Sequence, residues 1–456
     1  MSLIIDCIYL LAAAALSPMV AYRMVRYKRY RAGWAQRFGK ITRRYPEKKC
    51  VWLHAVSVGE VNASRTIIEE LKKQLPDFEI VISTTTDTGF SRANELFGKN
   101  HTVFYFPLDF SLVMQRAFRS ICPAICLLVE LEVWPNFVQI AHQSNIPIVV
   151  INGRISDRSF SKYKKIKLIV KNIFKKVDLV LAQTDQYAGR FKEIGCSADK
   201  VIVTGSLKYD TAQVTDKVEG ANILAEQLFG KIDNPDSFGT IDNPLWVAGG
   251  TGPDEEKIIL DVYRVLKNQF ENLRLAIVPR KPERFDEVAQ LIEQSGFDII
   301  RYSQIKNHST KKSNTERRLS AVASAKAEAT GDESRIILGD TMGDLRKFYS
   351  VADLIFVGRS LVPMGGSDMM EAAALGKCTI FGPYAFNFQQ AVDDLLANQG
   401  AIMVRDEQDL LRTVQKCLFE PAFAQTIARN GRETIRKNQG ATAKSVDAIM
   451  KLLNSR

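Results

Sequence analysis

The sequence predicts an α/β protein with two domains, each organised around a doubly wound parallel sheet. Short apolar runs, each long enough for one buried strand, alternate with segments in which apolar residues recur at helical intervals. This alternation is typical of parallel sheets that are covered by helices. It breaks down between residues 211 and 243, where Gly, Asn, Pro and Asp cluster, so we place a linker between the two domains there.

Length and composition describe an ordinary globular protein with a positive net charge. The 456 residues allow two or three domains, and 46% hydrophobic with 25% charged residues is a normal balance. The net charge of +11 favours anionic partners: nucleic acid, acidic lipid or a phosphorylated substrate. Nucleic acid is disfavoured, because no aromatic residues suited to base stacking are interleaved with the basic clusters.

The cysteines and histidines argue against a metal site. Seven cysteines are scattered without a CxxC pair, and four histidines show no paired spacing. We therefore expect reduced, buried thiols in a cytosolic compartment and no zinc.

The N-terminal segment predicts a membrane anchor. Residues 3–21 are apolar apart from Asp6, Ser17 and Pro18, a length close to that needed to span a bilayer. Six arginines and lysines follow within residues 23–37, which would keep the long C-terminal part in the cytoplasm and attract anionic lipid. A tilted or interfacial helix is one alternative to a single span, and a buried helix of a soluble protein is another.

The first strand–turn–helix unit carries the first candidate functional residue. Residues 51–56 form an apolar run suited to a buried strand, a small-residue turn follows, and helical spacing begins near Glu60. Ligands of open α/β sheets bind at the carboxyl ends of strands, where Glu60 lies. A carboxylate at a helix start also complements the helix dipole, so the residues alone favour a helix cap over a catalytic group.

Polar residues also follow other predicted strands of the N-terminal half. Residues 124–129 form a buried strand that ends in Glu130, with Glu132 two positions further on. Carboxylates that end separate strands converge on one edge of a sheet and are weak evidence for acid–base chemistry. The other polar residues at strand ends of this half are Thr84–Thr86, Asn152, Arg154 and Gln183.

Residues 162–176, with the sequence KYKKIKLIVKNIFKK, form a basic amphipathic segment. We interpret this segment as a helix with a solvated lysine face. The alternative is a second contact with the membrane surface.

The C-terminal half predicts a second sheet with a phosphate-binding edge. After a strand at residues 352–357, Gly365–Gly366 open a helix that runs through Ser367, Asp368 and Glu371. Free N–H groups at that helix start would hold a phosphate, although Ser367 or Asp368 could simply be an N-cap. Arg280, at the end of a different strand, would bring a cation to the same crevice.

Two nucleotide-binding motifs are absent. The chain contains no GxxxxGK[ST] P-loop, and no GxGxxG follows the first strand. ATP hydrolysis and NAD chemistry are therefore disfavoured.

The predicted domain division follows from these patterns. Residues 1–40 are the membrane anchor and basic juxtamembrane segment, residues 41–210 the first Rossmann-like domain, and residues 211–243 the linker. Residues 244–456 form the second Rossmann-like domain, in which residues 306–334, polar and without apolar periodicity, are expected to be a mobile loop. The pattern implies that the two domains face each other across a cleft.

Nine motifs, in order and over nearly the whole chain, resemble the 3-deoxy-D-manno-octulosonic acid (Kdo) transferases. The motifs are HAVSVGEV at 54–61, STTTDTG at 83–89, LVELEVWPN at 128–136, NGRISDRS at 152–159, VTGSLKYD at 203–210, VPRKPERF at 278–285, GDTMGDL at 339–345, FVGRSLVPMGG at 356–366 and FGPYAFNF at 381–388. The resemblance implies GT-B architecture, with the active site between two Rossmann-like domains. It also implies inverting transfer of Kdo from CMP-Kdo to the lipid A precursor (lipid IVA) in lipopolysaccharide core biosynthesis, without a metal or other cofactor, at the cytoplasmic face of the inner membrane.

The resemblance assigns catalytic roles to three residues of the N-terminal half. Glu60 matches the family's general base, which takes the proton from an acceptor hydroxyl as it attacks the anomeric carbon. Glu130 and Lys208 match positions that stabilise the transition state. Lys208 would neutralise the donor carboxylate or the leaving phosphate, and Glu130 would favour an oxocarbenium-like centre or orient Lys208.

The resemblance places CMP in the C-terminal half. Glu371 is the candidate for the ribose hydroxyls and Arg280 for the single phosphate, which an arginine and a helix end would hold without Mg²⁺. The matching CMP-binding positions are Pro279, Arg280, Met342, Gly343, Asp344, Asp368, Met369, Met370 and Glu371.

The sequence departs from the family pattern at three places. The family's STH-type turn appears as Gly250–Thr251–Gly252, and its GNLK appears as Gly205–Ser206–Leu207–Lys208. The family's GGHNPLE is replaced by GGSDMMEAA at residues 365–373, so that His, Asn and Pro become Ser367, Asp368 and Met369. Asp368 brings a negative charge near an expected phosphate and should weaken CMP binding unless it turns away. The Glu60 side of the site matches the family.

Two alternatives to a Kdo transferase remain at this point. One is a GT-B transferase or epimerase that uses another nucleotide sugar, such as a UDP-sugar. The other is a non-catalytic, membrane-tethered protein that binds lipid, for which residues 162–176 are the best support.

Overall fold

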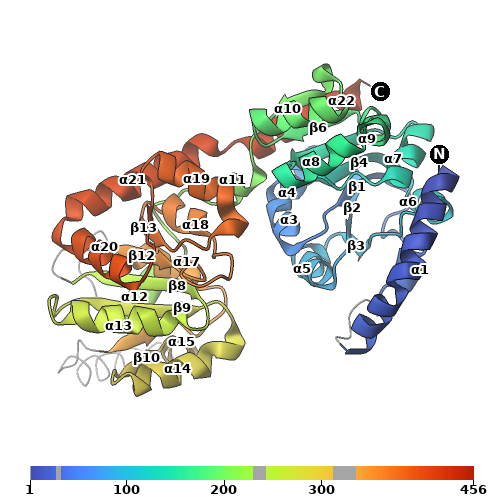
Figure 1. The fold of residues 1–456 in the computed structure, drawn as a ribbon. Helices are drawn as coiled ribbons and strands as arrows, with labels where there is room; N and C mark the ends of the chain where they lie inside the picture. The colour runs from blue at the N-terminus through green and yellow to red at the C-terminus, as the bar shows by residue number, and fades with distance from the viewer. Residues whose placement is uncertain (1, 27–31, 230–242, 312–334, 456) are drawn as a thin grey trace. The chain divides into compact units, whose positions relative to one another are not determined.

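The structure is a computed structural model that describes residues 2–26, 32–229, 243–311 and 335–455 (Figure 1). The chain divides into two compact units. Unit 1 contains residues 1–211 and 438–456, and unit 2 contains residues 212–437.

The described part of unit 1 is built on a seven-stranded parallel sheet with the strand order β3-β2-β1-β4-β5-β6-β7. The chain runs outward from β1 through β2 to β3, then returns to the other side of β1 with β4. The order therefore reverses between β1 and β4, which is the topological switch point at which open α/β sheets bind ligands. The strands are β1 (Lys49–His54), β2 (Phe78–Thr84), β3 (Thr102–Tyr105), β4 (Pro123–Val129), β5 (Ile148–Gly153), β6 (Leu179–Ala182) and β7 (Val201–Val203).

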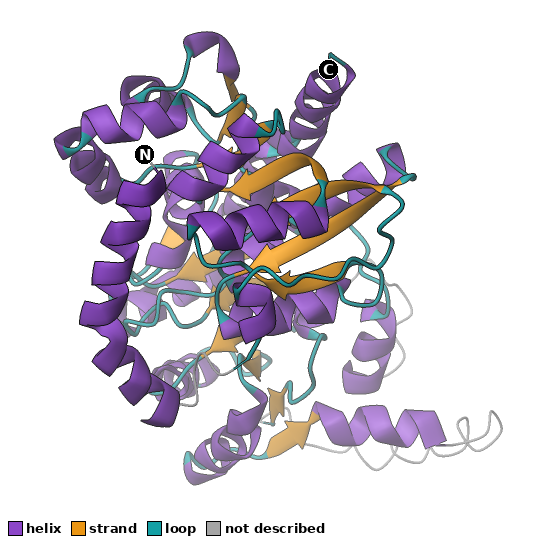
Figure 2. Ribbon diagram, turned by 90° about the vertical axis from the view of Figure 1, so that its right-hand side faces the viewer, coloured by secondary structure: helices purple, strands orange, loops and turns teal. Residues whose placement is uncertain are grey.

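Helices cover both faces of the unit 1 sheet (Figure 2). Because side chains alternate along a strand, Val51 and Leu53 of β1 point to one face and Cys50 and Trp52 to the other. The first face packs against α3, α4 and α22, and the second against α6 and α7. The helices of this unit are α1 (Ser2–Arg26), α2 (Trp34–Arg37), α3 (Val58–Ala63), α4 (Arg65–Gln74), α5 (Asp87–Phe97), α6 (Ser111–Ile121), α7 (Pro135–Gln143), α8 (Asp157–Lys165), α9 (Lys167–Phe174), α10 (Asp185–Ile194), α11 (Leu207–Thr211) and α22 (Ala441–Asn454).

Unit 2 repeats this architecture. Its described residues form a second seven-stranded parallel sheet in the order β10-β11-β9-β8-β12-β13-β14, with the switch point between β8 and β12. The strands are β8 (Leu245–Thr251), β9 (Arg274–Pro279), β10 (Ile299–Arg301), β11 (Ile336–Leu338), β12 (Leu354–Val357), β13 (Cys378–Phe381) and β14 (Ile402–Met403).

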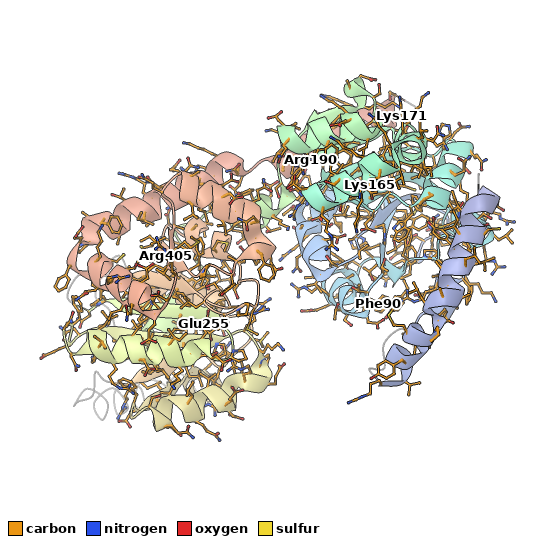
Figure 3. All side chains as sticks on the ribbon, viewed as in Figure 1. Phe90, Lys165, Lys171, Arg190, Glu255 and Arg405 are labelled. Atoms are coloured by element: carbon orange, nitrogen blue, oxygen red, sulfur yellow. The ribbon has the colours of Figure 1, made fainter. Side chains whose placement is uncertain are left out.

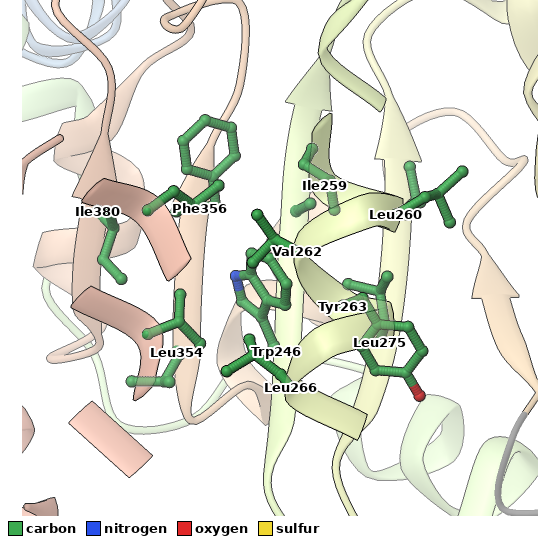
Figure 4. Packing of buried hydrophobic residues seen from close by; sticks show 14 of the residues in the cluster. Trp246, Ile259, Leu260, Val262, Tyr263, Leu266, Leu275, Leu354, Phe356 and Ile380 are labelled. Atoms are coloured by element: carbon green, nitrogen blue, oxygen red, sulfur yellow. The ribbon is translucent and has the colours of Figure 1, made fainter. Parts of the chain in front are cut away.

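The unit 2 core is a layer of apolar side chains between the sheet and its helices. Trp246 of β8 and Phe356 of β12 pack against Ile259, Val262 and other residues of α13 (Figure 4). The helices of this unit are α12 (Ala221–Phe229), α13 (Glu255–Lys267), α14 (Phe285–Gln294), α15 (Tyr302–Lys311), α17 (Leu345–Val351), α18 (Met369–Ala374), α19 (Gln389–Ala397), α20 (Glu407–Phe419) and α21 (Pro421–Asn438). The predicted fold class, α/β with two parallel sheets, is confirmed.

The structure divides the chain differently from the prediction at two places. The C-terminal helix α22 packs in unit 1, whereas the sequence placed residues 244–456 together in the second domain. Within the predicted linker, helix α12 packs against α15 and α17 of unit 2, and residues 230–242 lie outside the described part. Of the expected mobile loop 306–334, residues 306–311 belong to helix α15 and the rest lie outside the described residues.

The basic segment 162–176 also differs from the single helix that we predicted. The chain forms two helices, α8 and α9, that meet at Ile166, and Lys165 and Lys171 lie on either side of this break (Figure 3). Val170, Ile173 and Phe174 of α9 are buried, whereas Leu168 and Ile169 are exposed.

Helix α1 is attached to unit 1 through polar contacts. Asp6 accepts hydrogen bonds from the Ser111 N–H at 3.0 Å and from the Asn136 side chain at 2.9 Å, and the Tyr9 hydroxyl donates to Asp109 at 3.0 Å. These contacts place α1 against α6 and α7. None of the helices in the described part of the chain combines the length and the apolar character needed to cross a bilayer.

Candidate functional site

The structure places Glu60 at the switch point of the unit 1 sheet. Strand β1 ends at His54, and the turn Ala55–Ser57 leads into helix α3, whose first turn contains Glu60. The Ser57 side chain accepts the Glu60 N–H at 3.4 Å and donates its hydroxyl to the Glu60 carboxylate at 2.7 Å. The same carboxylate accepts the Val56 N–H at 2.8 Å. Glu60 therefore completes a reciprocal capping box, so the capping interpretation is correct.

The cap leaves Glu60 half-buried in an environment that suits a base. Burial raises the pKa of Glu60, the bonds from Val56 and Ser57 oppose this shift, and the negative charge of Glu130 adds to it. A carboxylate with a raised pKa accepts a proton more readily at neutral pH. Glu60 can thus cap its helix and still act as a proton acceptor.

Glu130 follows β4, on the other side of the switch point. Its backbone lies in the left-handed region at φ 57°, and its N–H donates to the Ile151 carbonyl at 2.9 Å. A non-glycine residue in this region is strained, and such strain clusters at functional sites. The structure thus brings Glu60 and Glu130, 70 positions apart in the sequence, into electrostatic contact.

Glu132 is a third carboxylate of this group, and the sequence analysis named it only as a polar residue after a predicted strand. It accepts the Trp134 indole N–H at 3.0 Å. Burial, the charge of Glu60 and the charge of Glu130 together raise the pKa of Glu132 to about 7, although the Trp134 bond opposes this shift.

Lys208 lies on the short helix α11, which contacts α3, the helix of Glu60. The start of α11 is held by Asn152 at the end of β5, whose side-chain oxygen accepts the Leu207 N–H at 3.0 Å. The other end is held by Asp210, which accepts N–H groups of Gly440 and Thr442. The three predicted catalytic residues therefore lie on neighbouring elements of unit 1.

In unit 2, the predicted donor residues lie in loops that follow parallel strands. Arg280 comes directly after β9, and its N–H donates to the Thr251 carbonyl at the end of β8 at 3.1 Å. The Arg280 side chain is exposed, and its charge acts on Glu371, the residue proposed for the ribose.

Glu371 lies in the first turn of α18, in a charged environment. Burial, followed by the charge of Asp368, raises the pKa of Glu371 to about 7, and Arg346 and Arg280 oppose this shift. A guanidinium nitrogen of Arg346 lies 4.0 Å from the Glu371 carboxylate. The sequence missed Arg346 because it lies in α17 and its only signal is its charge.

Asp368 is the N-cap of α18. Its carboxylate accepts the Met370 N–H at 2.9 Å. This bond uses one of the helix-start N–H groups that the sequence analysis proposed for a phosphate. Ser367 donates its hydroxyl to the Gly250 carbonyl at 2.8 Å and so links this loop to the end of β8.

The other predicted CMP residues differ in their accessibility. Met342 is 64% exposed, next to Gly343 at φ 86°. Asp344 is buried and accepts hydrogen bonds from Lys306 at 2.6 Å and Lys347 at 2.8 Å. Burial alone would raise the pKa of Asp344, but these bonds and one from Thr341 lower it.

Met369 and Met370 are buried inside unit 2. Their side chains therefore pack in the core and do not line an open surface, which differs from the contact with CMP that we expected. Pro279 is the last residue of β9 and is also buried.

Metal-ligating side chains do not gather in the described residues: no group of three or more His, Cys, Asp or Glu there could hold a metal ion. The polar groups of the two units are carboxylates, arginines and lysines, which suit proton transfer and the binding of an anion.

Comparison with known proteins assigns the family. Residues 32–211 match the family model described as 3-deoxy-D-manno-octulosonic-acid transferase (kdotransferase). The chain is 32% identical over 427 residues to the 3-deoxy-D-manno-octulosonic acid transferase of Haemophilus influenzae, covering 93% of this chain and 92% of the relative. The chain belongs to the Kdo transferase family. It is therefore a glycosyltransferase, as the sequence predicted.

A second relative supports the same assignment. The 3-deoxy-D-manno-octulosonic acid transferase of Bordetella pertussis is 28% identical over 458 residues, covering 97% of this chain and 98% of the relative.

Solved structures are similar in fold. The UDP-GlcNAc 2-epimerase of Neisseria meningitidis aligns with a TM-score of 0.54 at 14% identity, covering 88% of this chain and all of that one. A glycosyltransferase of Rickettsia africae gives the same score and identity and covers 90% of this chain. At this identity the likeness confirms the GT-B fold class of the Kdo transferase and nothing about its substrate.

Proposed function

We propose that this Kdo transferase moves Kdo from CMP-Kdo to the lipid A precursor, lipid IVA, with inversion at the anomeric carbon. The observation that carries the proposal is the placement of Glu60 and Glu130 on the two sides of the unit 1 switch point, with Lys208 on an adjoining helix. Glu60 takes the proton of the attacking acceptor hydroxyl. Lys208 and Glu130 act on the charges that develop as the donor breaks, the lysine on the anionic groups of the donor and the carboxylate on the oxocarbenium-like centre.

The donor half of the proposal rests on unit 2. Glu371 accepts the ribose hydroxyls, while Arg280 and Arg346 supply positive charge for the single phosphate of CMP. Two arginines can neutralise one phosphate, so we propose a reaction that needs no metal.

We further propose that the protein acts at the cytoplasmic face of the inner membrane and attaches to it through α1. Several apolar side chains of this helix are exposed, among them Leu11 at 73% and Val25 at 76%. Asp6 is bonded to unit 1, so its carboxylate need not enter lipid. A helix that lies at the interface, held to unit 1 by its polar contacts and offering its exposed apolar side chains to lipid, fits these observations.

The test of the donor and acceptor is a product analysis by mass spectrometry. The full chain is incubated with lipid IVA and either CMP-Kdo or UDP-sugars, in the presence of EDTA. We expect a Kdo-modified lipid from CMP-Kdo alone. Turnover of UDP-sugars only would establish the alternative donor, and metal-reversible loss of activity in EDTA would contradict the metal-free reaction.

Replacing Glu60 with Gln tests the proposed base. Gln also fits the third position of a capping box, so the fold should persist while kcat falls by about 10²–10³-fold. The matched control is Ser57→Ala, which removes a capping hydroxyl that also bonds the carboxylate; it should cost about 1 kcal/mol of stability and lower activity far less than Glu60→Gln. If Glu60→Gln kept full activity, Glu60 would have no place in the mechanism.

A further inference from the structure

Two consecutive glutamates at the start of α13, Glu255 and Glu256, are fully buried. Glu255 lies inside unit 2 (Figure 3). Buried carboxylates are rare unless they are paired or hydrogen-bonded, so each of the two must have partners that offset the cost of its burial.

The Glu255 carboxylate binds backbone groups from both sides of the unit 2 switch point. One oxygen accepts the N–H groups of Ser360 and Leu361, both at 2.9 Å. The other accepts the N–H groups of Arg359 and, at 3.4 Å, Gly252. Gly252 follows β8 and residues 359–361 follow β12, so one side chain joins the two loops that flank the crevice.

Further hydrogen bonds continue from these loops to the start of α18. The carbonyl of Gly358 accepts the Ser367 N–H at 3.0 Å, and that of Arg359 accepts the Gly366 N–H at 2.8 Å. Arg359 itself has a φ of 60°, a strained conformation that persists only where its surroundings fix it. This chain of contacts ends at the residues that directly precede the helix of Glu371.

Glu256 holds a different loop of the donor half. Its carboxylate receives two nitrogens of Arg284, at 2.6 and 3.3 Å. Arg284 ends the short turn that follows Arg280, so this bidentate pair fixes the segment that carries the candidate phosphate ligand.

We propose that Glu255 and Glu256 are positioning residues for the donor, Glu255 for the ribose through the helix of Glu371 and Glu256 for the phosphate through the loop of Arg280. This inference rests on the proposed donor role of unit 2. Neither glutamate touches the nucleotide. Each acts through the backbone or guanidinium that it holds, so loss of one carboxylate changes how one part of CMP is recognised.

The test is nucleotide selectivity of the full chain, measured by calorimetry below the melting range. The probes are CMP, 2′-deoxyCMP, which lacks one ribose hydroxyl, and cytidine, which lacks the phosphate. Glu255→Gln removes the acceptor for one pair of N–H groups, and the preference for CMP over 2′-deoxyCMP should fall at least fivefold. Glu256→Gln should instead lower the preference for CMP over cytidine at least fivefold.

A matched control separates positioning from general damage. Glu287 also pairs with Arg284, at 2.8 Å, but its side chain is 63% exposed, so Glu287→Gln should leave both preferences unchanged. Glu255→Asp and Arg284→Lys replace the first two variants if those do not fold, and the same two shifts are expected. Lower melting temperatures with both preferences intact would overturn the inference. Failure of the wild-type chain to bind CMP at all would overturn the proposed donor site, and this inference with it.

Discussion

At the scale of single residues, the candidate site depends on carboxylates whose protonation is set by their surroundings. Glu60, Glu132 and Glu371 all have raised pKa values, chiefly through burial and secondarily through neighbouring carboxylates. Perturbed pKa values cluster at functional sites, although structural networks also produce them. The sequence analysis had already selected the segments that contain these three residues, because each segment follows a predicted strand.

Asp368 gives a prediction about pH. Its charge contributes to the raised pKa of Glu371, which is about 7. Below that pH Glu371 is protonated and loses the charge that accepts the ribose hydroxyls, so CMP affinity should fall as the pH decreases through 7. Asp368→Asn keeps a good N-cap and removes the negative charge, so the pKa of Glu371 should drop.

We therefore expect Asp368→Asn to bind CMP about fivefold more tightly at pH 7, since an incompletely screened unit charge contributes about 1 kcal/mol. Calorimetric Kd values from pH 5.5 to 8.5 should show the decline in affinity displaced to lower pH. Titration of the phosphate of free CMP is common to both measurements and cancels in the comparison. In a Glu371→Gln background the substitution should lose this displacement. Identical pH curves for the wild type and Asp368→Asn would contradict the electrostatic argument.

At the residue scale, the sequence could predict which residues lie at the ends of strands, but not which groups those residues bind. Glu60 and Glu130 were found because they end apolar runs. Glu255 also follows a strand, yet three of its four partners are backbone N–H groups 104 to 106 residues further on. Nothing in the order of residues along the chain identifies such a contact. The burial of Met369 and Met370 could not be predicted either, because buried and exposed methionines look alike in sequence.

At the scale of elements, strands were predicted well because those of parallel sheets are continuous apolar runs. The segment 162–176 was less well predicted. Its apolar period continues through Ile166, but α8 ends and α9 begins there, and Leu168 and Ile169 are exposed. A periodic pattern records which residues are apolar and does not record where a helix ends without a cap signal.

Helix α1 carries a prediction of its own. Its exposed apolar side chains include Ile8, Leu11 and Leu16. Replacing these three with Ser should reduce co-sedimentation with vesicles that contain anionic phospholipid by at least tenfold, because three of the large apolar side chains offered to the interface become polar. Asp6→Asn is the control, since it weakens the attachment of α1 to unit 1 and leaves the apolar face intact. Unchanged vesicle binding by the triple variant would exclude α1 as the attachment.

We also expect deletion of residues 1–21 to give a more soluble protein that still binds CMP.

At the scale of the whole molecule, the chain belongs to unit 1 at both of its ends. Val446 and Ile449 of α22 are fully buried in the unit 1 core, and Thr442 meets Thr66 of α4 at 2.8 Å. The amphipathic pattern of α22 is that of a helix that packs on one face. It could not tell which of two similar α/β cores the helix covers, because both present the same kind of apolar face.

This arrangement predicts that the two units melt separately and respond to different changes. Ile449→Ala should lower the stability of unit 1 by about 2–5 kcal/mol, because a buried side chain is removed and a cavity remains. Saturating CMP should instead stabilise unit 2, by about 2.7 kcal/mol at 100 times its Kd. Differential scanning calorimetry of the full chain should therefore show one transition that falls in Ile449→Ala and another that rises with CMP. If the substitution lowered the CMP-sensitive transition, α22 would stabilise the donor unit, and the assignment of the C-terminal helix to the unit of Glu60 would be wrong.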